Sequence, residues 1–333
     1  MRIIRSFLIG AGLVAAFTAG PVGAQGARTG EPIQPLPERV TDVDPAKVRL
    51  GARLFADKRL SGDGSVSCQS CHLPHAGGAD PRRHSVGAFG AIRDLNSPPI
   101  ANLVYMTVGL NWTGRTQNLD KQIAGSMSNK STMNHNWESV LKILAADPEI
   151  SADFKRVYGG EVNQANVSDA IVSFERAQIT PSPFDKWLRG DDKALTKAEM
   201  AGYRKFKEFG CVGCHSGPAL GGQMFAKLGV HGDYFAYREA KGRGALVDAD
   251  KGRYEVTKKP EDLHVFRVPQ LRNIALTAPY FHDGSVESLH EAVQLMGRHQ
   301  LGRELSDADV QSIVTFLHAL TGTQFAGSKV ARR

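Results

Sequence analysis

The sequence predicts a mostly helical protein that consists of two similar domains. Residues 45–57 have the apolar spacing of a helix and precede a Cys-x-x-Cys-His motif at 68–72, and the same order recurs around the motif at 211–215. Sustained strand-like alternation is lacking in the sequence, and residues 251–267 are expected to form a short hairpin at most. The turn-rich Thr-Pro-Ser-Pro at 180–183 is the expected hinge between the domains.

The expected helices follow from spacing and from capping patterns. Apolar residues recur at helical spacing in three segments, 45–57, 137–146 and 167–179. Thr196 and Glu199 form a capping-box pattern that opens a helix leading to the second motif. Ser288 and Ser306 begin two more such patterns near the carboxyl end.

Both motifs predict covalent attachment of haem, since they contain all four cysteines: Cys68, Cys71, Cys211 and Cys214. Two thiols three positions apart can reach the two vinyl groups of one porphyrin, and the next residue presents an imidazole to the iron. A thioredoxin-like dithiol is not normally followed by histidine, and a zinc site would bring both pairs into one small module. We therefore expect two c-type haems, ligated by His72 and His215, in two class I cytochrome c-like domains.

The first 24 residues have the pattern of a signal peptide. Residues 2–5 carry basic side chains, residues 7–17 are apolar, and Val-Gly-Ala at 22–24 offers a cleavage site. The apolar run is too short to span a bilayer, and we expect no membrane span elsewhere. We expect export to the periplasm, followed by domains at 25–180 and 181–325 and a flexible tail at 326–333.

The charge pattern argues against nucleic-acid binding. The formal net charge is +7, but the basic residues are scattered and no basic run is interleaved with aromatic residues. A modest positive field of this kind could steer an acidic electron-transfer partner.

An ordered set of segments between residues 50 and 322 is specific to one protein family. The set comprises LFADKRLS from residue 54, NSPP from 96, WTGRTQNLDKQ from 112, CVGCHSGPALGGQMF from 211, DKGRYEVT from 250 and FRVPQLRNIALTAPYFHDG from 266. Through these segments the chain resembles the bacterial diheme cytochrome c peroxidases, a family that also contains the MauG-type enzymes of methylamine utilisation. The resemblance implies a catalytic haem in the amino-terminal domain and an electron-receiving haem in the carboxyl-terminal domain.

At the second haem, the resemblance implies that Met296 is the distal ligand opposite His215. A thioether ligand opposite an imidazole raises the haem potential, as in electron-transfer cytochromes c. The alternative is a core methionine near the end of a helix. MauG-type enzymes carry tyrosine at this position, so Met296 argues against that subgroup.

At the first haem, the sequence departs from the family twice. Relatives place a distal histidine where an ungapped match puts Ala88, and His84 could substitute for it as an iron ligand if the loop is rearranged. Relatives also carry a glutamate in a Gly-Pro…Glu-Met segment, where this chain has Thr132. A hydroxyl is a poor general base, although it can hold a water that relays a proton. Gln122, a pocket residue in the family, is retained, and His135 is a possible replacement base.

Three further features follow from the resemblance. Trp112 matches a tryptophan that lies between the two haems and is thought to assist electron passage; it could equally serve only to fill the interface. Asn96, Thr277 and Pro279 match the family's interdomain Ca²⁺ site, whose oxygen ligands suit a hard cation. Relatives are often dimers, so a homodimer is possible.

The leading hypothesis is a periplasmic peroxidase that reduces hydrogen peroxide to water with electrons from a small cytochrome c or cupredoxin. One alternative is a MauG-like oxidase that acts on a partner protein or an organic substrate. Another is a non-catalytic electron-transfer or redox-sensing cytochrome, which the loss of the histidine and the glutamate would favour. With Ala88 and Thr132 in the pocket, we expect an open distal side and weak turnover.

Overall fold

The computed structural model describes residues 28–325, so the expected signal peptide and the expected tail lie outside the described residues. The described part is mostly helical, as predicted. Its helices are α1 (Pro45–Ala56), α2 (Leu119–Ser128), α3 (Trp137–Ala145), α4 (Pro148–Tyr158), α5 (Gln164–Arg176), α6 (Pro183–Leu188), α7 (Lys197–Glu208), α8 (Tyr234–Ala240), α9 (Tyr254–Thr257), α10 (Leu289–Gln300) and α11 (Asp307–His318), and its strands are β1 (Phe225–Lys227) and β2 (Val265–Arg267).

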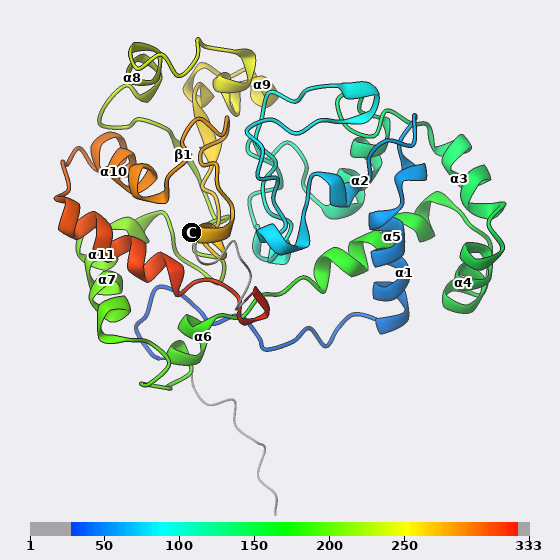
Figure 1. Ribbon diagram of the computed structural model, residues 1–333, viewed down its shortest axis with the longest axis horizontal. Coiled ribbons are helices and arrows are strands. Elements are labelled where there is room, and N and C mark those ends of the chain that lie inside the picture. Colours follow the sequence, from blue (N-terminus) through cyan, green and yellow to red (C-terminus); the bar gives the residue numbers. More distant parts are fainter. Residues whose placement is uncertain (1–27, 326–333) are drawn as a thin grey trace, which may run out of the picture.

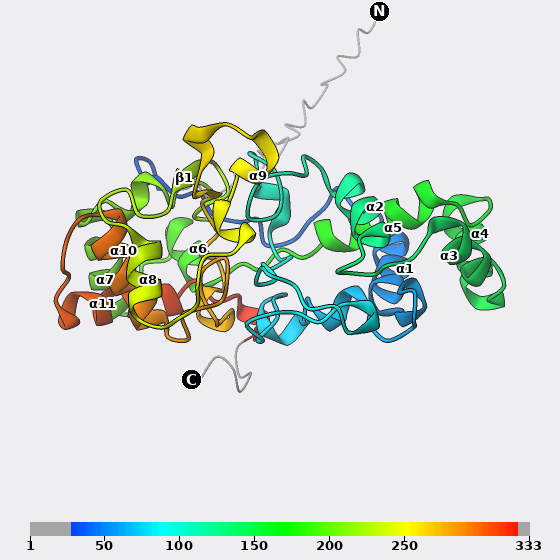
Figure 2. The ribbon, with the colours of Figure 1, turned by 90° about the horizontal axis from the view of Figure 1, so that it is seen from above.

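The molecule is elongated and has two halves side by side (Figures 1 and 2). The first half holds α1 to α5, and the second half holds α6 to α11. One hydrophobic cluster draws its buried residues from positions 50–171, and a second draws nearly all of its residues from positions 184–320. Each half therefore has its own core.

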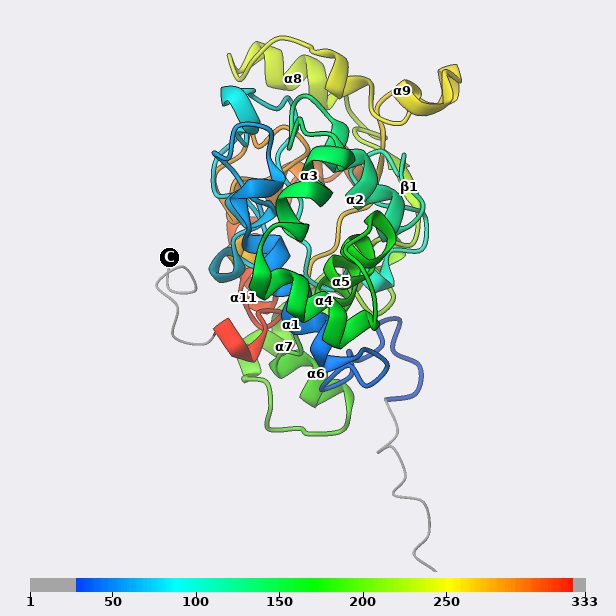
Figure 3. The same ribbon diagram turned by 90° about the vertical axis from the view of Figure 1, so that its right-hand side faces the viewer.

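The first half is organised around the crossing of α1 and α5. Leu50, Leu54 and Phe55 of α1 are buried in its core. Gly51 lies at the crossing, where an added Cβ would be 1.9 Å from the carbonyl oxygen of Ala170 on α5. The two backbones are thus too close for any side chain at this position. Helices α3 and α4 cover the outer end of this half (Figures 1 and 3).

The second half repeats this arrangement with α7 and α11. Tyr203 and Phe206 of α7 pack against Phe316 of α11. Gly202 lies at the crossing, where an added Cβ would be 2.0 Å from the carbonyl oxygen of Ser312.

The helix starts follow the caps that the sequence predicts. Thr196 and Glu199 form the expected capping box before α7, and Ser288 and Ser306 cap α10 and α11. Helix α5 begins and ends three residues earlier than expected, because Asn163 accepts a hydrogen bond from the backbone N–H of Asn166 and so caps the helix.

The expectation of a hairpin within residues 251–267 is wrong. Strand β2 pairs antiparallel with β1, with Phe225 opposite Arg267, and residues 251–264 contain α9 and short 3₁₀ turns. The partner strand comes from a segment whose three residues are too few to show a strand period in the sequence.

The start of the described chain packs against the second half. Ile33 belongs to the second core, and the backbone N–H of Leu36 donates to Asp185 Oδ1 at 2.7 Å. Tyr203 donates a hydrogen bond to Glu31. Residues 28–36 therefore lie apart from the domain that the sequence assigned to them.

The two halves meet at Thr180, at the start of the expected hinge. Its hydroxyl oxygen accepts hydrogen bonds from Nδ2 of Asn102 in the first half and from Nδ2 of Asn273 in the second, each at 2.8 Å. Both asparagines have left-handed backbones, with φ of 62° and 61°. The junction is thus a buried polar contact shared by both halves.

Among residues 28–325, every helix is too short or too polar to cross a lipid bilayer.

Candidate haem sites

The two histidines of the cysteine motifs have the same local geometry. Nδ1 of His72 lies 3.1 Å from the carbonyl oxygen of Gly78, and Nδ1 of His215 lies 3.1 Å from that of Leu220. A ring nitrogen that faces a carbonyl oxygen carries the proton and donates it, so Nε2 keeps its lone pair. Burial lowers the pKa of both imidazoles and so favours the neutral form. Each ring thus presents the unprotonated Nε2 that iron ligation requires.

Each histidine is backed by a phenylalanine from the helix that precedes its motif. The ring of Phe55 on α1 lies 6.4 Å from that of His72, and the ring of Phe206 on α7 lies 6.5 Å from that of His215. Because each phenylalanine is four residues after the crossing glycine, the crossing also sets where the histidine can lie.

The cysteines lie on short 3₁₀ turns that keep both thiols beside the histidine. In the first motif, the backbone N–H groups of Cys71 and His72 both donate to the carbonyl oxygen of Cys68; the second motif repeats this pattern. Burial raises the pKa of Cys68 to about 12 and that of Cys211 to about 11, so both are neutral thiols until a haem is attached.

A cavity of about 280 Å³ lies beside the first motif. Cys68, Cys71 and His72 line it. Phe55 and Pro98 are among its apolar lining residues. One polar wall of the lining comes from α2 and the turn that follows it: Lys121, Gln122, Ser126, Asn129, Ser131 and Thr132.

The charges around this cavity fit a c-type haem. Four cationic residues line it, and none of them forms an ion pair within residues 28–325: Arg93, Arg115, Lys121 and Arg267. Arg267 is only 4% exposed, and burial lowers its pKa to about 10. A buried cation needs a counter-charge. The two propionates of a haem attached to Cys68 and Cys71 would supply it.

Sequence reasoning missed the four cationic residues and also the one carboxyl of the cavity lining, Glu175 on α5. Its carboxyl is 5% exposed, and its Oε2 has no hydrogen-bond partner in the described part of the chain. Burial, with a smaller contribution from Asp120, raises the pKa of Glu175 to about 8. The signal in the sequence is its place four residues after the buried Ile171, on the inner face of the helix.

The two positions at which the chain departs from the family touch through their backbones. The N–H of Ala88 donates to the carbonyl oxygen of Thr132 at 2.7 Å. The hydroxyl of Thr132 donates to the carbonyl oxygen of Ser126 at 2.6 Å. Thr132 lines the cavity, but its one hydroxyl proton is already bound within the turn.

A chain of hydrogen bonds runs along the polar side of the cavity. Nδ2 of Asn111 donates to Oε1 of Gln122 at 2.8 Å, and Nε2 of Gln122 donates to Oγ of Ser126 at 3.0 Å. All three residues line the cavity. Gln122 is therefore held in one orientation by partners at both ends of its amide.

The structure does not bring His84 or His135 to the cavity. Nδ1 of His84 lies 2.8 Å from the carbonyl oxygen of Arg93, and Nδ1 of His135 accepts from the backbone N–H of Asn136. Neither ring contributes to the cavity lining.

Met296 lies on α10, the helix that follows the segment 266–284. Leu289, Val293 and Met296 share one face of this helix. Leu289 and Val293 pack against the second core, as do Cys211 and Val212 of the motif. Met296 thus shares a helix face with two residues that pack against the second core.

Trp112 lies where the two halves meet. Its indole Nε1 donates to the carbonyl oxygen of Asn96 at 2.8 Å, and its own carbonyl oxygen accepts from the N–H of Arg267. Its ring also packs edge-on against His282 of the second half, with 6.4 Å between the centroids.

The residues matched to a Ca²⁺ site lie in segments that contact each other. The backbone N–H of Asn96 donates to the carbonyl oxygen of His282 at 2.8 Å. A Cβ placed on Gly77 would lie 3.1 Å from Thr277, and one placed on Gly284 would lie 3.1 Å from Pro279.

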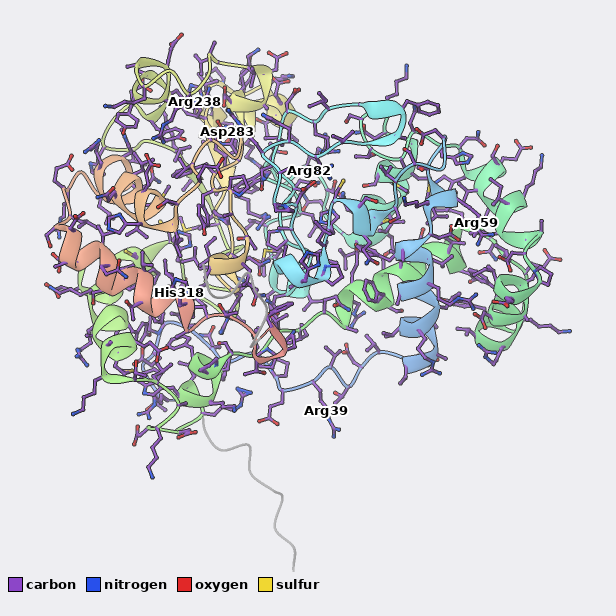
Figure 4. The ribbon with its side chains drawn as sticks, viewed as in Figure 1. Arg39, Arg59, Arg82, Arg238, Asp283 and His318 are labelled. Carbon is purple, nitrogen blue, oxygen red and sulfur yellow. The ribbon has the colours of Figure 1, made fainter. Side chains whose placement is uncertain are left out.

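A buried charge cluster lies above this interface and was not expected from the sequence. Arg238 donates to Asp250 at 2.6 Å and to Asp283 at 2.9 Å, and Nε2 of His282 lies 2.6 Å from Asp250. Figure 4 labels Arg238 and Asp283. The cluster fixes His282, and through its ring the neighbourhood of Trp112.

Comparison with known proteins identifies the family. Residues 45–193 match the family model described as di-haem cytochrome c peroxidase. The chain is 43% identical over 296 residues to cytochrome c551 peroxidase of Nitrosomonas europaea, covering 88% of this chain and 85% of the relative. It is 44% identical over 294 residues to cytochrome c peroxidase Ccp of Escherichia coli, covering 88% of this chain but only 61% of that longer relative.

A solved structure has the same fold along its whole length. It is a MauG-like protein associated with microbial copper homeostasis, 27% identical, with a TM-score of 0.76 over 89% of this chain and 97% of that one. The chain therefore belongs to the di-haem cytochrome c peroxidase family and is an oxidoreductase of that type.

Proposed function

We propose that this protein reduces hydrogen peroxide to water at the first haem site. The overall reaction consumes one H₂O₂, two electrons and two protons and yields two water molecules. The observation that carries the proposal is the repeated histidine geometry, in which both His72 and His215 present an unprotonated Nε2, together with the polar cavity that adjoins His72. When bound, the haems supply the redox chemistry of the iron.

The two haem sites would have different roles, peroxide reduction at the first and electron reception at the second. His215 and Met296 would hold the haem that receives single electrons from a small cytochrome c or cupredoxin, since a thioether ligand raises its potential. Trp112, at the contact between the halves, lies on the route to the first site.

The chain's own residues make the first site open but weakly equipped. Ala88 has no side chain that could reach an iron, so peroxide can enter without the prior release of a distal histidine. Gln122 is held by Asn111 and Ser126, and Thr132 lacks the carboxylate that would move a proton. Loss of a general acid–base group typically costs about 10²–10⁴ in rate.

The protein would have two domains, a periplasmic location and a Ca²⁺ ion between its halves. Each half would be a cytochrome c-like domain, residues 28–36 would dock onto the second domain, and the chain would be exported to the periplasm after cleavage of residues 1–24. A Ca²⁺ ion held by Asn96 and by carbonyl oxygens near Thr277 and Pro279 would join the halves; neighbouring segments already lie together there.

Steady-state peroxide turnover with reduced cytochrome c tests the proposal. The fully oxidised protein and a protein reduced beforehand should show the same weak activity, because the distal side is open in both. Absence of peroxide turnover in both preparations would contradict the proposal.

A MauG-like oxidase is the second candidate, and the altered pocket favours it. The MauG-like structural neighbour has the same fold at 27% identity, whereas Met296 argues against this candidate. Peroxide-dependent oxidation of an organic reductant without a cytochrome donor would favour it over the peroxidase.

A further inference from the structure

The Ser126 hydroxyl is a donor in the first cavity without a partner of its own. Its oxygen accepts a hydrogen bond from Nε2 of Gln122 at 3.0 Å, but within residues 28–325 no acceptor takes its proton. Other hydroxyls of this wall are engaged: Thr132 donates to the carbonyl oxygen of Ser126, and Ser131 donates to Oδ1 of Asn129. Ser126 therefore differs from Thr132 and Ser131, because its hydroxyl proton has no acceptor among the described residues.

The orientation of this donor is fixed by the residues behind it. Oε1 of Gln122 accepts from Nδ2 of Asn111 at 2.8 Å, so the NH₂ group of Gln122 must face Ser126. The carbonyl oxygen of Asn111 is held in turn by Nε of Arg267 at 2.9 Å. Because the hydroxyl oxygen accepts from Gln122, its proton must point to another partner, and the cavity that Ser126 lines is where one can bind.

We propose that the Ser126 hydroxyl donates a hydrogen bond to peroxide, or to an anion in its place, bound on the α2 side of the first haem. This inference rests on the proposed function and names the group that touches the substrate there. Gln122 is a positioning residue in this arrangement, since it acts through Ser126. The donor replaces part of the polarity lost with the family's glutamate, because Thr132 spends its own proton on the Ser126 carbonyl.

A neutral hydroxyl has a definite chemical consequence. It stabilises negative charge on a bound ligand but cannot take up a proton at ordinary pH. Removing it should weaken the binding of a small anion about 2- to 10-fold, the effect of one hydrogen bond on a binding constant. The same change should lower kcat for peroxide more than it changes KM, if the bond strengthens as charge develops on the oxygen.

Fluoride binding to the oxidised diheme protein is the direct test, with the charge-transfer absorption of the ferric haem as the readout. Ser126→Ala should weaken fluoride binding about 2- to 10-fold, and Ser126→Thr should retain it. Ser128→Ala is the matched control, because Ser128 lies on the same helix and its hydroxyl donates to the carbonyl oxygen of Ala124. Alanine is the best helix former, so both variants should keep α2.

The outcomes separate this inference from the proposed function. Unaltered fluoride affinity in Ser126→Ala, or an equal loss in Ser128→Ala, would overturn the role of Ser126. A wild-type protein that turns over no peroxide, but loses fluoride affinity only on Ser126→Ala, would refute the peroxidase and leave the donor standing.

Discussion

The two halves share one frame and differ in what surrounds the histidine. In each half, a glycine at a helix crossing is followed four residues later by a phenylalanine that backs the histidine, whose Nδ1 is held by a backbone carbonyl 3.1 Å away. The frame therefore explains haem attachment, which both halves need.

The two halves differ in the residues that surround this shared arrangement. The first histidine adjoins a cavity with four unpaired cations and a buried carboxyl. The second half packs Phe184, Tyr203 and Phe316 into an aromatic cluster, with ring centroids 4.9–5.1 Å apart. Catalysis and electron reception thus depend on residues that the frame leaves free to vary.

Adding a side chain at the helix crossing should have the largest effect. It tests whether both halves depend on the same close packing of two helices. Gly51→Ala places a Cβ 1.9 Å from a backbone oxygen, which α1 can relieve only by moving away from α5. We expect the free energy of unfolding to fall by roughly 3 kcal/mol, the upper end for overpacking, and the axial ligation of the first haem to be disrupted before that of the second on heating.

Matched variants sharpen this result. Gly202→Ala should reverse the order in which the axial ligation of the two haems is disrupted, whereas Gly160→Ala, where the nearest atom is 3.8 Å away, should cost little. Thermal unfolding followed at the Soret band measures all three. A loss below about 1 kcal/mol for Gly51→Ala would show that the crossing can relax.

Replacing Met296, the proposed distal ligand of the second haem, should change the potential of that haem and leave that of the first unaltered. Met296→His exchanges a thioether for a stronger donor that favours ferric iron, so the potential of the second haem should fall by a sizeable part of the roughly 0.8 V over which axial ligands act. Potentiometric titration should show the first haem unaltered. If neither potential moves and the spectrum stays the same, Met296 is a core residue.

A carboxylate at position 132 should make the first site more similar to the catalytic site of the relatives of this protein. Thr132→Glu supplies a group that can move a proton between the two peroxide oxygens, and we expect kcat to rise about tenfold or more. Thr132→Gln is the control, since it has the same size without the proton chemistry. Equal rates in the two variants would show that position 132 does not face the substrate.

The helices and cysteine motifs of the frame, but not its glycine crossings, could be predicted from the sequence because they depend on local patterns. The Cys-x-x-Cys-His spacing, the capping box at Thr196 and the apolar spacing of residues 45–57 each involve neighbours within a few positions. The structure has these features at the residues where the sequence predicts them.

The walls of the cavity could not be predicted because they depend on contacts between distant segments. Arg267 reaches the first cavity from a strand of the second half, and Glu175 is buried by packing that its own helix does not reveal. The pairing of Phe225 with Arg267 and the docking of Ile33 onto the second core are likewise long-range. Propensity within a short window carries no information about such contacts.

The buried carboxyl should make the stability of the first half depend on pH. The pKa of Glu175 is about 8 in the folded chain and ordinary when unfolded, so its contribution is complete below about pH 4 and is lost as pH rises toward 8. Glu175→Gln stays neutral at every pH and should flatten this part of the profile. Urea unfolding of the holoprotein between pH 4 and pH 9 measures the difference. The exposed Glu287→Gln should leave the profile as it is, and a profile unaffected by Glu175→Gln would mean that the carboxyl is ionised when folded.

The smallest effect is expected for His84→Ala, and it decides whether the first distal side is open. Nδ1 of His84 lies 2.8 Å from the carbonyl oxygen of Arg93, and the ring does not line the cavity, so its loss should cost about 1 kcal/mol of stability at most and leave the spin state of the ferric haem unaltered. Paramagnetic resonance of the oxidised protein, before and after the substitution, measures this. Conversion of a six-coordinate low-spin signal to a high-spin one would identify His84 as a distal ligand. The first half would then resemble the second in having both axial positions filled, and peroxide could enter only after that ligand had left.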